Sequence, residues 1–316
     1  MSTIAIAKLR AMYSGRETDQ IRPRLVWPQL CNRNWESEIQ RNATVKIPTR
    51  DFTVTASDYT AGANWKTPEN IDLTLQDLTI NIRTETGNGV EKETFLAAPI
   101  DVVAALADQH GFEHAKKINE KVRDVFADGA TSGNTETVGS ATVHVHRQTG
   151  EPTGTGANAL VFNGIDAMSV SLMNAHVLDT GDVERRVFAI CSPAMLKSVR
   201  SYALSQGWNE QMSREIVTSG DLGNAPPGYR FTLFGIDFYV TSLYKTAQIS
   251  GKWHSVIMVG TREAVTYAGL PSDPLFLTPA NNQISGPNYR IGSVRRAACK
   301  VVDTNQLYRL NVRAEA

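Results

Sequence analysis

Two histidines and a glutamate at residues 110–114 are the side chains in this sequence whose types and spacing best suit metal chemistry. The segment reads His110-Gly-Phe-Glu113-His114. On a helix, histidines four residues apart face one side and can hold a zinc ion, while the glutamate acts as general base, as in inverted zinc proteases. The alternative is a helix surface that carries two histidines. Gly111 inside the helix and the lack of an evident third ligand downstream favour that alternative.

Three other segments could carry chemistry, and each has a plainer interpretation. His144 and His146 share one face of a predicted strand, but two ligands alone do not make a metal site, so solvent-facing residues are expected. The glycines of residues 150–156 lack the Lys-Ser/Thr of a phosphate loop, which predicts a surface loop. Cys191 ends an apolar strand and is expected in the core. The sequence therefore predicts no catalytic, cofactor-binding or metal-binding residues, and no enzyme.

The composition predicts a protein with a packed core. The chain has 316 residues, of which 41% are hydrophobic and 20% charged. No apolar run approaches the roughly 18 residues that a membrane span needs, and Lys8 and Arg10 interrupt the N-terminal segment, so neither a membrane contact nor a signal peptide is expected. The three cysteines are far apart without a CxxC pair, which indicates unpaired thiols in a reducing compartment.

The net charge is zero, but its distribution is uneven. Residues 1–50 hold nine Lys/Arg and four acids (+5), and residues 283–316 hold six and two (+4), which leaves about −9 for the middle. Basic ends around an acidic middle indicate contact with something anionic, either other subunits or nucleic acid. Arg22 and Arg24 are the candidate residues for this contact. The alternative is that these cations are only solvated.

Residues 45–95 predict a long β-hairpin. Val45–Tyr59 and Ile71–Arg83 read as two extended arms, joined by a tip rich in turn-forming residues. The apolar alternation of the second arm changes phase at Asp77, as a β-bulge would make it do. An isolated two-stranded ribbon is marginal in water, so this hairpin is expected to lie on another surface. Residues 84–94 predict a turn-rich return.

The remaining pattern predicts a mixed α+β protein. No sustained periodicity precedes residue 44, and Arg22-Pro23 and Trp27-Pro28 break any long element, which predicts an arm that binds along another surface. A long helix is expected from Pro99 to Gly129, with a buried stripe from Phe112 to Phe126, a Glu113–Lys117 pair on its other face and a bend at Gly111. Further helices are expected over 164–177 and, capped by Ser192, over 194–205. Strands are predicted at 141–147, 187–191, 229–233, 236–241, 253–259, 293–302 and 306–312, with 261–267 as helix or strand and 269–288 as loop.

Three passages in order resemble one family. They are Val45–Ile82, then Arg186–Leu196 with its strand and proline-led helix, then Gly220–Ser242 with the terminal strands from Arg290. In this order the chain resembles the major capsid proteins of tailed bacteriophages, with a Hong Kong 97-like fold. The resemblance implies five parts. They are an N-terminal arm (1–44), an extended loop (45–96), a peripheral domain with a spine helix (97–181), an apical domain (182–285) and C-terminal strands that return to the peripheral domain (286–316).

The resemblance also implies a function. Hexamers and pentamers of the chain would form an icosahedral shell around double-stranded DNA, bound without sequence specificity, in a virion assembled in the host cytoplasm. A portal and possibly decoration proteins are implied partners. No long charged helical segment precedes the predicted arm, so a separate scaffolding protein is expected. In one branch a lysine near the loop tip crosslinks neighbouring subunits; Lys66 occupies that place, but an exposed lysine is the default. An encapsulin-like cellular compartment is the alternative shell, and the zinc protease remains the enzymatic alternative.

Overall fold

The computed structural model describes residues 3–48, 75–91, 97–130, 135–138, 144–146, 152–153, 157–174, 187–206, 226–233, 235–249, 252–271, 273–279 and 288–315. Helices and strands are mixed in this part of the chain, which confirms the predicted combination of the two. None of its helices is long and apolar enough to cross a membrane.

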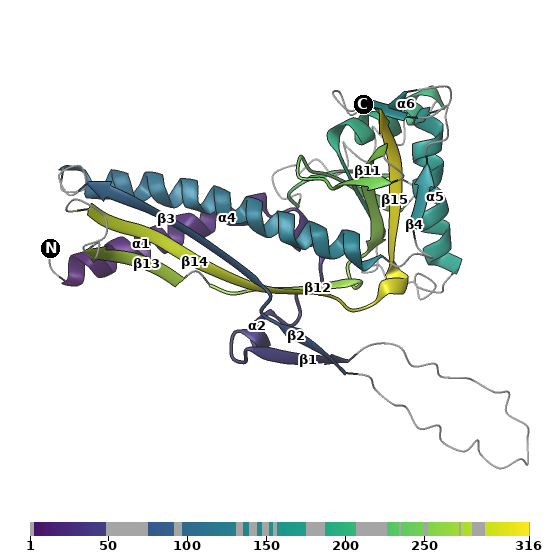
Figure 1. Cartoon of the computed structure of the whole chain (residues 1–316). Helices are drawn as coiled ribbons and strands as arrows, with labels where there is room; N and C mark the ends of the chain where they lie inside the picture. The colour runs from purple at the N-terminus through teal and green to yellow at the C-terminus, as the bar shows by residue number, and fades with distance from the viewer. Residues whose placement is uncertain are drawn as a thin grey trace, which may run out of the picture.

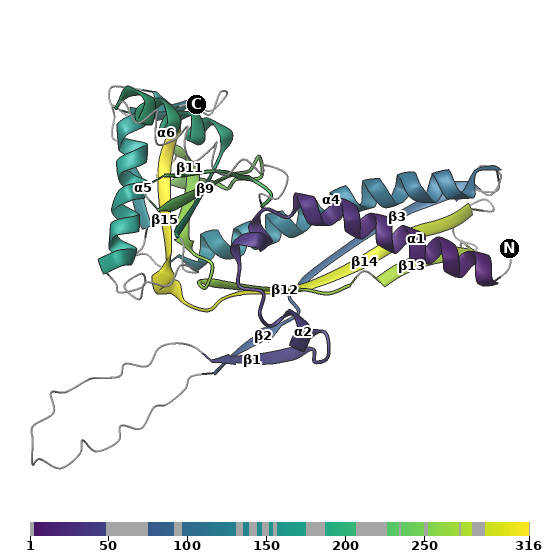
Figure 2. The ribbon, with the colours of Figure 1, turned by 180° about the vertical axis from the view of Figure 1, so that it is seen from behind.

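The molecule has three parts, which Figure 1 shows. Helix α4 (Pro99–Gly129) lies along a sheet of long strands and forms an elongated layer. At the end of this layer stands an upright body with the C-terminal strand and two helices. A short hairpin projects from the junction of the two. Figure 2 shows helix α1 (Thr3–Ile21) on the other side of the elongated layer, alongside α4 and strand β13.

Strand β14 is the centre of the elongated layer. The four strands of this sheet are β3 (Ile82–Glu91), β12 (Val265–Gly269), β13 (Asp273–Pro279) and β14 (Asn288–Val301). Strands β12 and β13 pair with successive halves of one edge of β14, and β3 pairs with its other edge over ten residues. All these pairs are antiparallel. The layer therefore depends on one strand from near the C-terminus.

Two of these strands contradict the prediction. Residues 84–94 were expected to form a turn-rich return, but β3 continues through Glu91 because β14 supplies its hydrogen-bond partners. Residues 269–288 were expected to be loop, but β13 pairs with β14 from Asp273 to Pro279. Pro274 and Pro279 are tolerated there because β13 pairs only with β14 among the described strands, and proline is acceptable on a strand with an unpaired edge.

Helix α4 forms as predicted, with Pro99 in its first turn and Asp101 near its positive end. One face of α4 is buried, and Ala115, Ile118, Val122 and Phe126 lie on it. Two details differ from the prediction. Phe112 is 49% exposed and does not belong to the buried stripe. The ammonium of Lys117 bonds to Glu120 at 2.9 Å, three residues away, and no bond to Glu113 forms within the described chain.

Helix α1 is a long element within residues 1–44, where the sequence predicted none. It has 19 residues and ends at Ile21, directly before Arg22-Pro23, so the proline ends this helix and does not interrupt it. Its buried residues are Tyr13, Glu17 and Ile21. A buried glutamate in the middle of this face hides the apolar periodicity by which a helix is recognised. The expectation that residues 1–44 contain no long element was therefore wrong.

The upright body is built on a mixed sheet. Its nine described strands are β4 (Thr135–Val138), β5 (His144–His146), β6 (Pro152–Thr153), β7 (Val187–Cys191), β8 (Tyr229–Leu233), β9 (Ile236–Val240), β10 (Thr246–Ile249), β11 (Lys252–Thr261) and β15 (Leu307–Glu315). Helices α5 (Ala157–Asn174) and α6 (Pro193–Ser205) cover it and complete one hydrophobic core. The hydroxyl of Ser192 accepts from the amide of Met195, which confirms the predicted cap of α6.

The last two strands separate, contrary to the prediction. Residues 286–316 were expected to return together to the elongated layer. Strand β14 does lie there, but β15 pairs with β11 in the upright body. The 3-10 turn η4 (Thr304–Gln306) between them redirects the chain, with Asp303 as its cap. The C-terminal strands thus connect the two parts of the molecule.

An aromatic cluster joins the two parts. The ring of Phe126, near the end of α4, lies 5.4 Å from Trp27 of η2 (Trp27–Leu30) and 5.9 Å from Phe188 of β7. All three side chains are buried. Large aromatic side chains contribute most to such contacts, so the end of the long helix is firmly held in the upright body.

The projecting hairpin confirms the base of the predicted loop. Strand β1 (Thr44–Pro48) pairs antiparallel with β2 (Leu75–Thr79). Residues 49–74, with the predicted tip and Lys66, lie outside the described part of the chain. The register runs unbroken through Asp77, so the predicted bulge is wrong. The strand is interrupted at residues 80–81, between β2 and β3, where the Asn81 amide bonds to both backbone groups of Cys299.

Candidate functional site

The two histidines of the candidate metal motif lie inside the protein. His110 and His114 are on the face of α4 that packs against α1, β3 and β14, and both are buried. The expectation of two surface histidines is therefore wrong. The sequence motif did not predict their burial, because the residues that surround them are far away in the sequence. We call these neighbours and the two histidines the buried polar cluster: Tyr13, Glu17, Thr84, Thr86, Asn88, His110, His114, Ser293 and Arg295.

Both ring nitrogens of His114 have protein partners. Nδ1 lies 2.7 Å from the hydroxyl of Thr84. Nε2 lies 2.9 Å from the hydroxyl of Ser293, 3.0 Å from that of Thr86 and 3.3 Å from the carboxylate of Glu17. The side chain of His114 is fully buried, so these bonds replace its contacts with water.

Both ring nitrogens of His110 also have protein partners. Its Nε2 lies 2.7 Å from the Oδ1 of Asn88. Its Nδ1 lies 2.6 Å from the hydroxyl of Tyr13, which itself donates to the hydroxyl of Ser293 at 3.2 Å. This chain of bonds connects α1, α4 and β3, and it leaves neither ring nitrogen of His110 without a protein partner.

Glu17 is the negative charge at the centre of the cluster. Its Oε1 accepts from the hydroxyl of Ser293, and its Oε2 lies 3.5 Å from Nη2 of Arg295. The same Nη2 donates to Thr18 at 2.8 Å, while Nε of Arg295 has no partner among the described groups. A buried charge is costly unless it is paired, so Glu17 and Arg295 stabilise one another across α1 and β14.

Burial shifts the protonation of the cluster. Loss of solvent lowers the pKa of His114 to about 4, although the Glu17 carboxylate opposes this shift, and it also lowers the pKa of His110. Burial likewise raises the pKa of Tyr13 to about 12. At neutral pH both histidines are therefore uncharged, and the cluster holds α1 against the elongated layer through hydrogen bonds and one ion pair.

This geometry does not fit a zinc protease. A metal ligand needs a free nitrogen lone pair, and the ring nitrogens of both histidines are already bonded to protein groups. The acid that reaches His114 is Glu17, and Glu113 is not among its bonded partners. Within the described residues no group of three His, Cys, Asp or Glu is placed to hold a metal ion. The cluster is structural, and it fastens helix α1.

Gly111 has a packing role between the two histidines. A Cβ at this position would lie 2.9 Å from the backbone oxygen of Glu17 and 2.9 Å from Cβ of Gln20. Both atoms belong to α1, so the absence of a side chain lets the two helices approach closely. Gly111 therefore lies at the close contact between α1 and α4.

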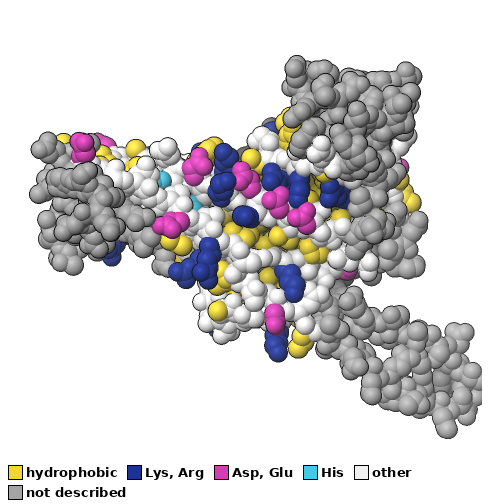
Figure 3. Space-filling model, viewed as in Figure 1, with side chains coloured by type: hydrophobic (Ala, Val, Ile, Leu, Met, Phe, Trp, Pro, Cys, Tyr) yellow, Lys and Arg dark blue, Asp and Glu magenta, His cyan; other side chains and the backbone are white. Residues whose placement is uncertain are grey.

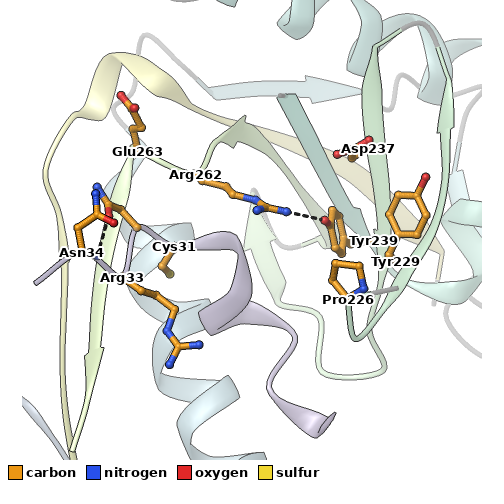
Figure 4. Close-up of a pocket in the computed structure, with 10 residues that line it drawn as sticks. Cys31, Arg33, Asn34, Pro226, Tyr229, Asp237, Tyr239, Arg262 and Glu263 are labelled. Carbon is orange, nitrogen blue, oxygen red and sulfur yellow. Dashed lines mark hydrogen bonds between the residues drawn. The ribbon is translucent and has the colours of Figure 1, made fainter. Parts of the chain in front are cut away.

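Apart from the buried polar cluster, the molecule has a hollow of about 630 Å³ where the two sheets meet. Figure 4 shows that Arg262 points across it toward Tyr239, with Nη2 3.1 Å from the phenol oxygen. Its charged side chains have partners in the chain: Arg33 bonds to both oxygens of Glu36, and Asp237 accepts from Thr232. The hollow thus lies at the join between the parts of the molecule, with Arg33, Asp237 and Arg262 bonded to other groups of the chain.

The other predicted candidates have simpler roles. Cys191 is a buried core residue, as predicted, and burial raises the pKa of its thiol to about 12. All three cysteines are free and buried. Strand β5 carries His144 and His146, but their side chains lie outside the described structure, as do the residues of 150–156 other than Pro152 and Thr153.

Surface charge and exposed apolar residues lie close together on the molecule. Figure 3 shows Lys and Arg side chains beside apolar ones across the face over α4 and the junction. The guanidinium of Arg24 lies 5.5 Å from the ring centroid of the exposed Phe112, and it donates to the backbone oxygen of Gln20 at 2.8 Å. At the hairpin, Val45, Ile47 and Leu78 pack on β12 and β14, whereas Leu75 is 53% exposed. These are surfaces of the kind that bind other protein chains.

Comparison with known proteins gives a fold and no close relative. No protein-family model matches the chain, and no curated protein matches its sequence. A structure from Mycobacterium phage Che8 is similar over 90% of both chains, with 17% identity and a TM-score of 0.57. The capsid of Ralstonia phage GP4 is similar over 87% of this chain and 84% of that one, with 12% identity and a TM-score of 0.59.

The chain has the fold of phage capsid proteins. The mature capsid of bacteriophage PhiM1 adds a third likeness, with 12% identity, a TM-score of 0.50 and 85% of this chain covered. The likeness extends over most of both chains in all three cases, so it covers the elongated layer and the upright body together. The predicted resemblance to tailed-phage capsid proteins is thereby confirmed at the level of the fold. Identities this low show the fold alone.

Proposed function

We propose that this chain is the major capsid protein of a tailed bacteriophage. In this proposal many copies assemble as hexamers and pentamers and close into an icosahedral shell around double-stranded DNA. The likeness of nearly the whole chain to phage capsid structures carries the proposal. The exposed hairpin and the elongated layer support it, because both offer large surfaces that a second copy can cover.

The parts of the molecule take roles within a Hong Kong 97-like arrangement. Helix α4 and the sheet around β14 serve as the spine helix and peripheral domain, and the upright body serves as the apical domain. Residues 45–96 form the extended loop, of which β1 and β2 are the base. The N-terminal arm begins as helix α1, docked on the spine helix through the buried polar cluster. In this proposal hexamers and pentamers consist of the same folded chain and differ in how neighbouring copies contact one another.

The partners follow from the role. A portal, a separate scaffolding protein and possibly decoration proteins complete the assembly, which takes place in the host cytoplasm and ends in the virion. The shell meets packaged DNA without reading its sequence, and the basic N-terminal segment contributes to contacts with acidic neighbours or with DNA. In this proposal the chain is a structural protein and not an enzyme. A content of about one zinc per chain by elemental analysis would contradict that statement.

Sedimentation of the assembled particles tests the role. Particles from cells that express the phage genes are expected to carry nuclease-protected DNA. Particles that carry a defined cargo protein and no DNA would instead indicate an encapsulin-like compartment. Replacing Arg22 and Arg24 with glutamate is expected to lower the yield of shells or their DNA content. An unchanged yield and DNA content would exclude a role for these two cations.

A further inference from the structure

A groove crosses the middle of α4 where the helix passes the base of the upright body. It has a volume of about 530 Å³. One wall is the 3-10 turn η1 (Arg22–Arg24) with α4, and the opposite wall is the entry to β8 with the segment after β9. A Cβ at Gly228 would lie 2.7 Å from Cγ1 of Val26, so the two walls meet closely at the bottom. The groove therefore lies between the elongated layer and the upright body.

The floor of the groove is already ordered by hydrogen bonds. Asn119 of α4 is buried, and its Oδ1 accepts from the backbone amide of Val26 at 3.1 Å. Its Nδ2 donates to the backbone oxygen of Arg24 at 2.8 Å. On the opposite wall, the hydroxyl of Thr241 accepts from the amide of Leu243 at 3.0 Å. Because these polar groups are bonded within the chain, the floor offers a ligand apolar contact on a preformed surface.

The lining of the groove is basic. Arg24, Lys116 and Arg230 contribute to it, and no Asp or Glu does among the described residues. Arg24 already donates to the backbone oxygen of Gln20 at 2.8 Å. Neither Lys116 nor Arg230 forms an ion pair within the described part of the chain. Cations without a carboxylate among them attract an anionic group.

The apolar part of the lining suits an aromatic ligand. Phe112 is 49% exposed and shares the lining with Val26, Val240 and Pro227. Small-molecule sites have volumes of about 300–1,000 Å³ and lie preferentially where domains meet, and this groove has both properties. A phosphate backbone gains nothing from the apolar side chains, since its contacts are with cations and hydrogen-bond donors.

A protein partner is also a poorer match for the groove. Stable protein interfaces cover about 800 Å² on each partner, whereas these side chains line a hollow that a single compact molecule can fill. The combined lining therefore favours a compact ligand with one anionic group and a flat apolar body.

We propose that the groove binds a small aromatic anion, a molecule with a flat ring system and one carboxylate, sulfonate or phosphate group. The anionic group meets Lys116 and Arg230, and the ring system packs on Phe112 and Val240. Such a ligand contacts both α4 and the upright body, so it stabilises the arrangement of the two parts that the structure shows. This inference goes beyond the proposed function and does not depend on shell formation.

Fluorescence titration of the unassembled full chain with anilinonaphthalene sulfonate, an aromatic sulfonate, tests the site. The dye is expected to saturate at one molecule per chain, with an affinity that falls as salt rises. The variant K116E/R230E is expected to bind it at least tenfold more weakly. K46E/K121E changes the net charge equally at two exposed positions outside the groove, and it should bind as the native chain does. Equal binding by the two variants would overturn the proposal.

The apolar half of the site has a test of its own. Phe112→Ala should weaken binding of the dye at least fivefold, whereas Leu204→Ala, at an exposed position of α6, should leave it unchanged. N-phenylnaphthylamine has the same rings without the sulfonate, so K116E/R230E should not weaken its binding. If K116E/R230E weakens binding of the neutral compound and the dye equally, the cations do not hold the anionic group and the proposal is wrong.

Hydrogen exchange locates the bound dye. The dye should slow exchange of the amides of residues 24–27 and 228–230 and leave those of α6 unchanged. Unchanged exchange at both walls would contradict the proposal. Competition then separates other occupants of the groove. Naphthoate, an aromatic carboxylate, should displace the dye, and inorganic phosphate should not. A short single-stranded DNA or an acidic peptide that displaces the dye at a lower concentration than naphthoate would assign the groove to a macromolecule and overturn the proposal.

Discussion

The close approach of α1 and α4 at Gly111 predicts the effect of adding a single methyl group. In Gly111→Ala the new Cβ meets a backbone oxygen and a Cβ of α1, both at 2.9 Å, and neither atom can move away without a shift of the helix. Overpacking of this kind costs about 1–3 kcal/mol. The amides of α1 exchange when α1 detaches from α4. Because α4 remains helical in that open state, the higher helix propensity of alanine at position 111 does not offset this cost.

Gly15→Ala is the matched control, since Gly15 is on α1 and a Cβ there meets nothing within 4 Å. Alanine improves the helix propensity by about 1 kcal/mol, which should protect α1. Hydrogen exchange of the α1 amides reports both effects. We expect exchange to become roughly 5–150-fold faster in Gly111→Ala and up to about fivefold slower in Gly15→Ala. Equal protection of α1 in the two variants would refute the packing of α1 on α4 described above.

Three further predictions follow from the same structure. The pKa of His114 in the folded chain lies below its unfolded value near 6.5, so between these two values the unfolded state binds one more proton than the folded state. The free energy of unfolding should therefore fall by up to about 3 kcal/mol as the pH drops from about 6.5 to 4. The substitution His114→Gln should remove this part of the pH dependence. Denaturant unfolding at pH 7 and pH 4.5 checks this, and identical pH dependence in both proteins would contradict it. Leu78→Ala, at a buried position, should destabilise the hairpin base by about 2–5 kcal/mol, whereas Leu75→Ala, at an exposed one, should leave the unassembled chain unchanged and weaken assembly. Proteolysis of the hairpin and shell yield separate the two, and equal effects would count against this burial. Ser192→Ala should cost about 1 kcal/mol through loss of the α6 cap, measured as a lower Tm, with Ser201→Ala as the control.

Local signals predicted the elements that carry their own start and stop residues. Helix α4 follows from Pro99, Asp101 and its apolar stripe, and α6 follows from Ser192-Pro193 after an apolar strand. The turn at Gly235, with φ of +78°, follows from glycine between two apolar runs. In each case the sequence within a few residues determines the structure.

The elements that the sequence missed depend on distant partners. Strands β3 and β13 are polar or proline-rich and are ordered by pairing with β14. Helix α1 buries Glu17, which is acceptable only because Ser293, Arg295 and His114 surround it. His110 and His114 resembled a metal motif because their spacing is visible in the sequence, whereas Tyr13 and Asn88, which occupy the ring nitrogens of His110, are not adjacent to them in sequence. Only the tertiary structure distinguishes the two interpretations.

Negative-stain electron microscopy of the purified chain, with size-exclusion chromatography of the same sample, tests the proposed function most directly. The proposed function predicts ring-shaped capsomers or closed shells, with a scaffolding protein added where the chain alone does not assemble. A chain that stays a homogeneous monomer at high concentration, with and without scaffolding protein, would contradict the proposal that it builds a phage head.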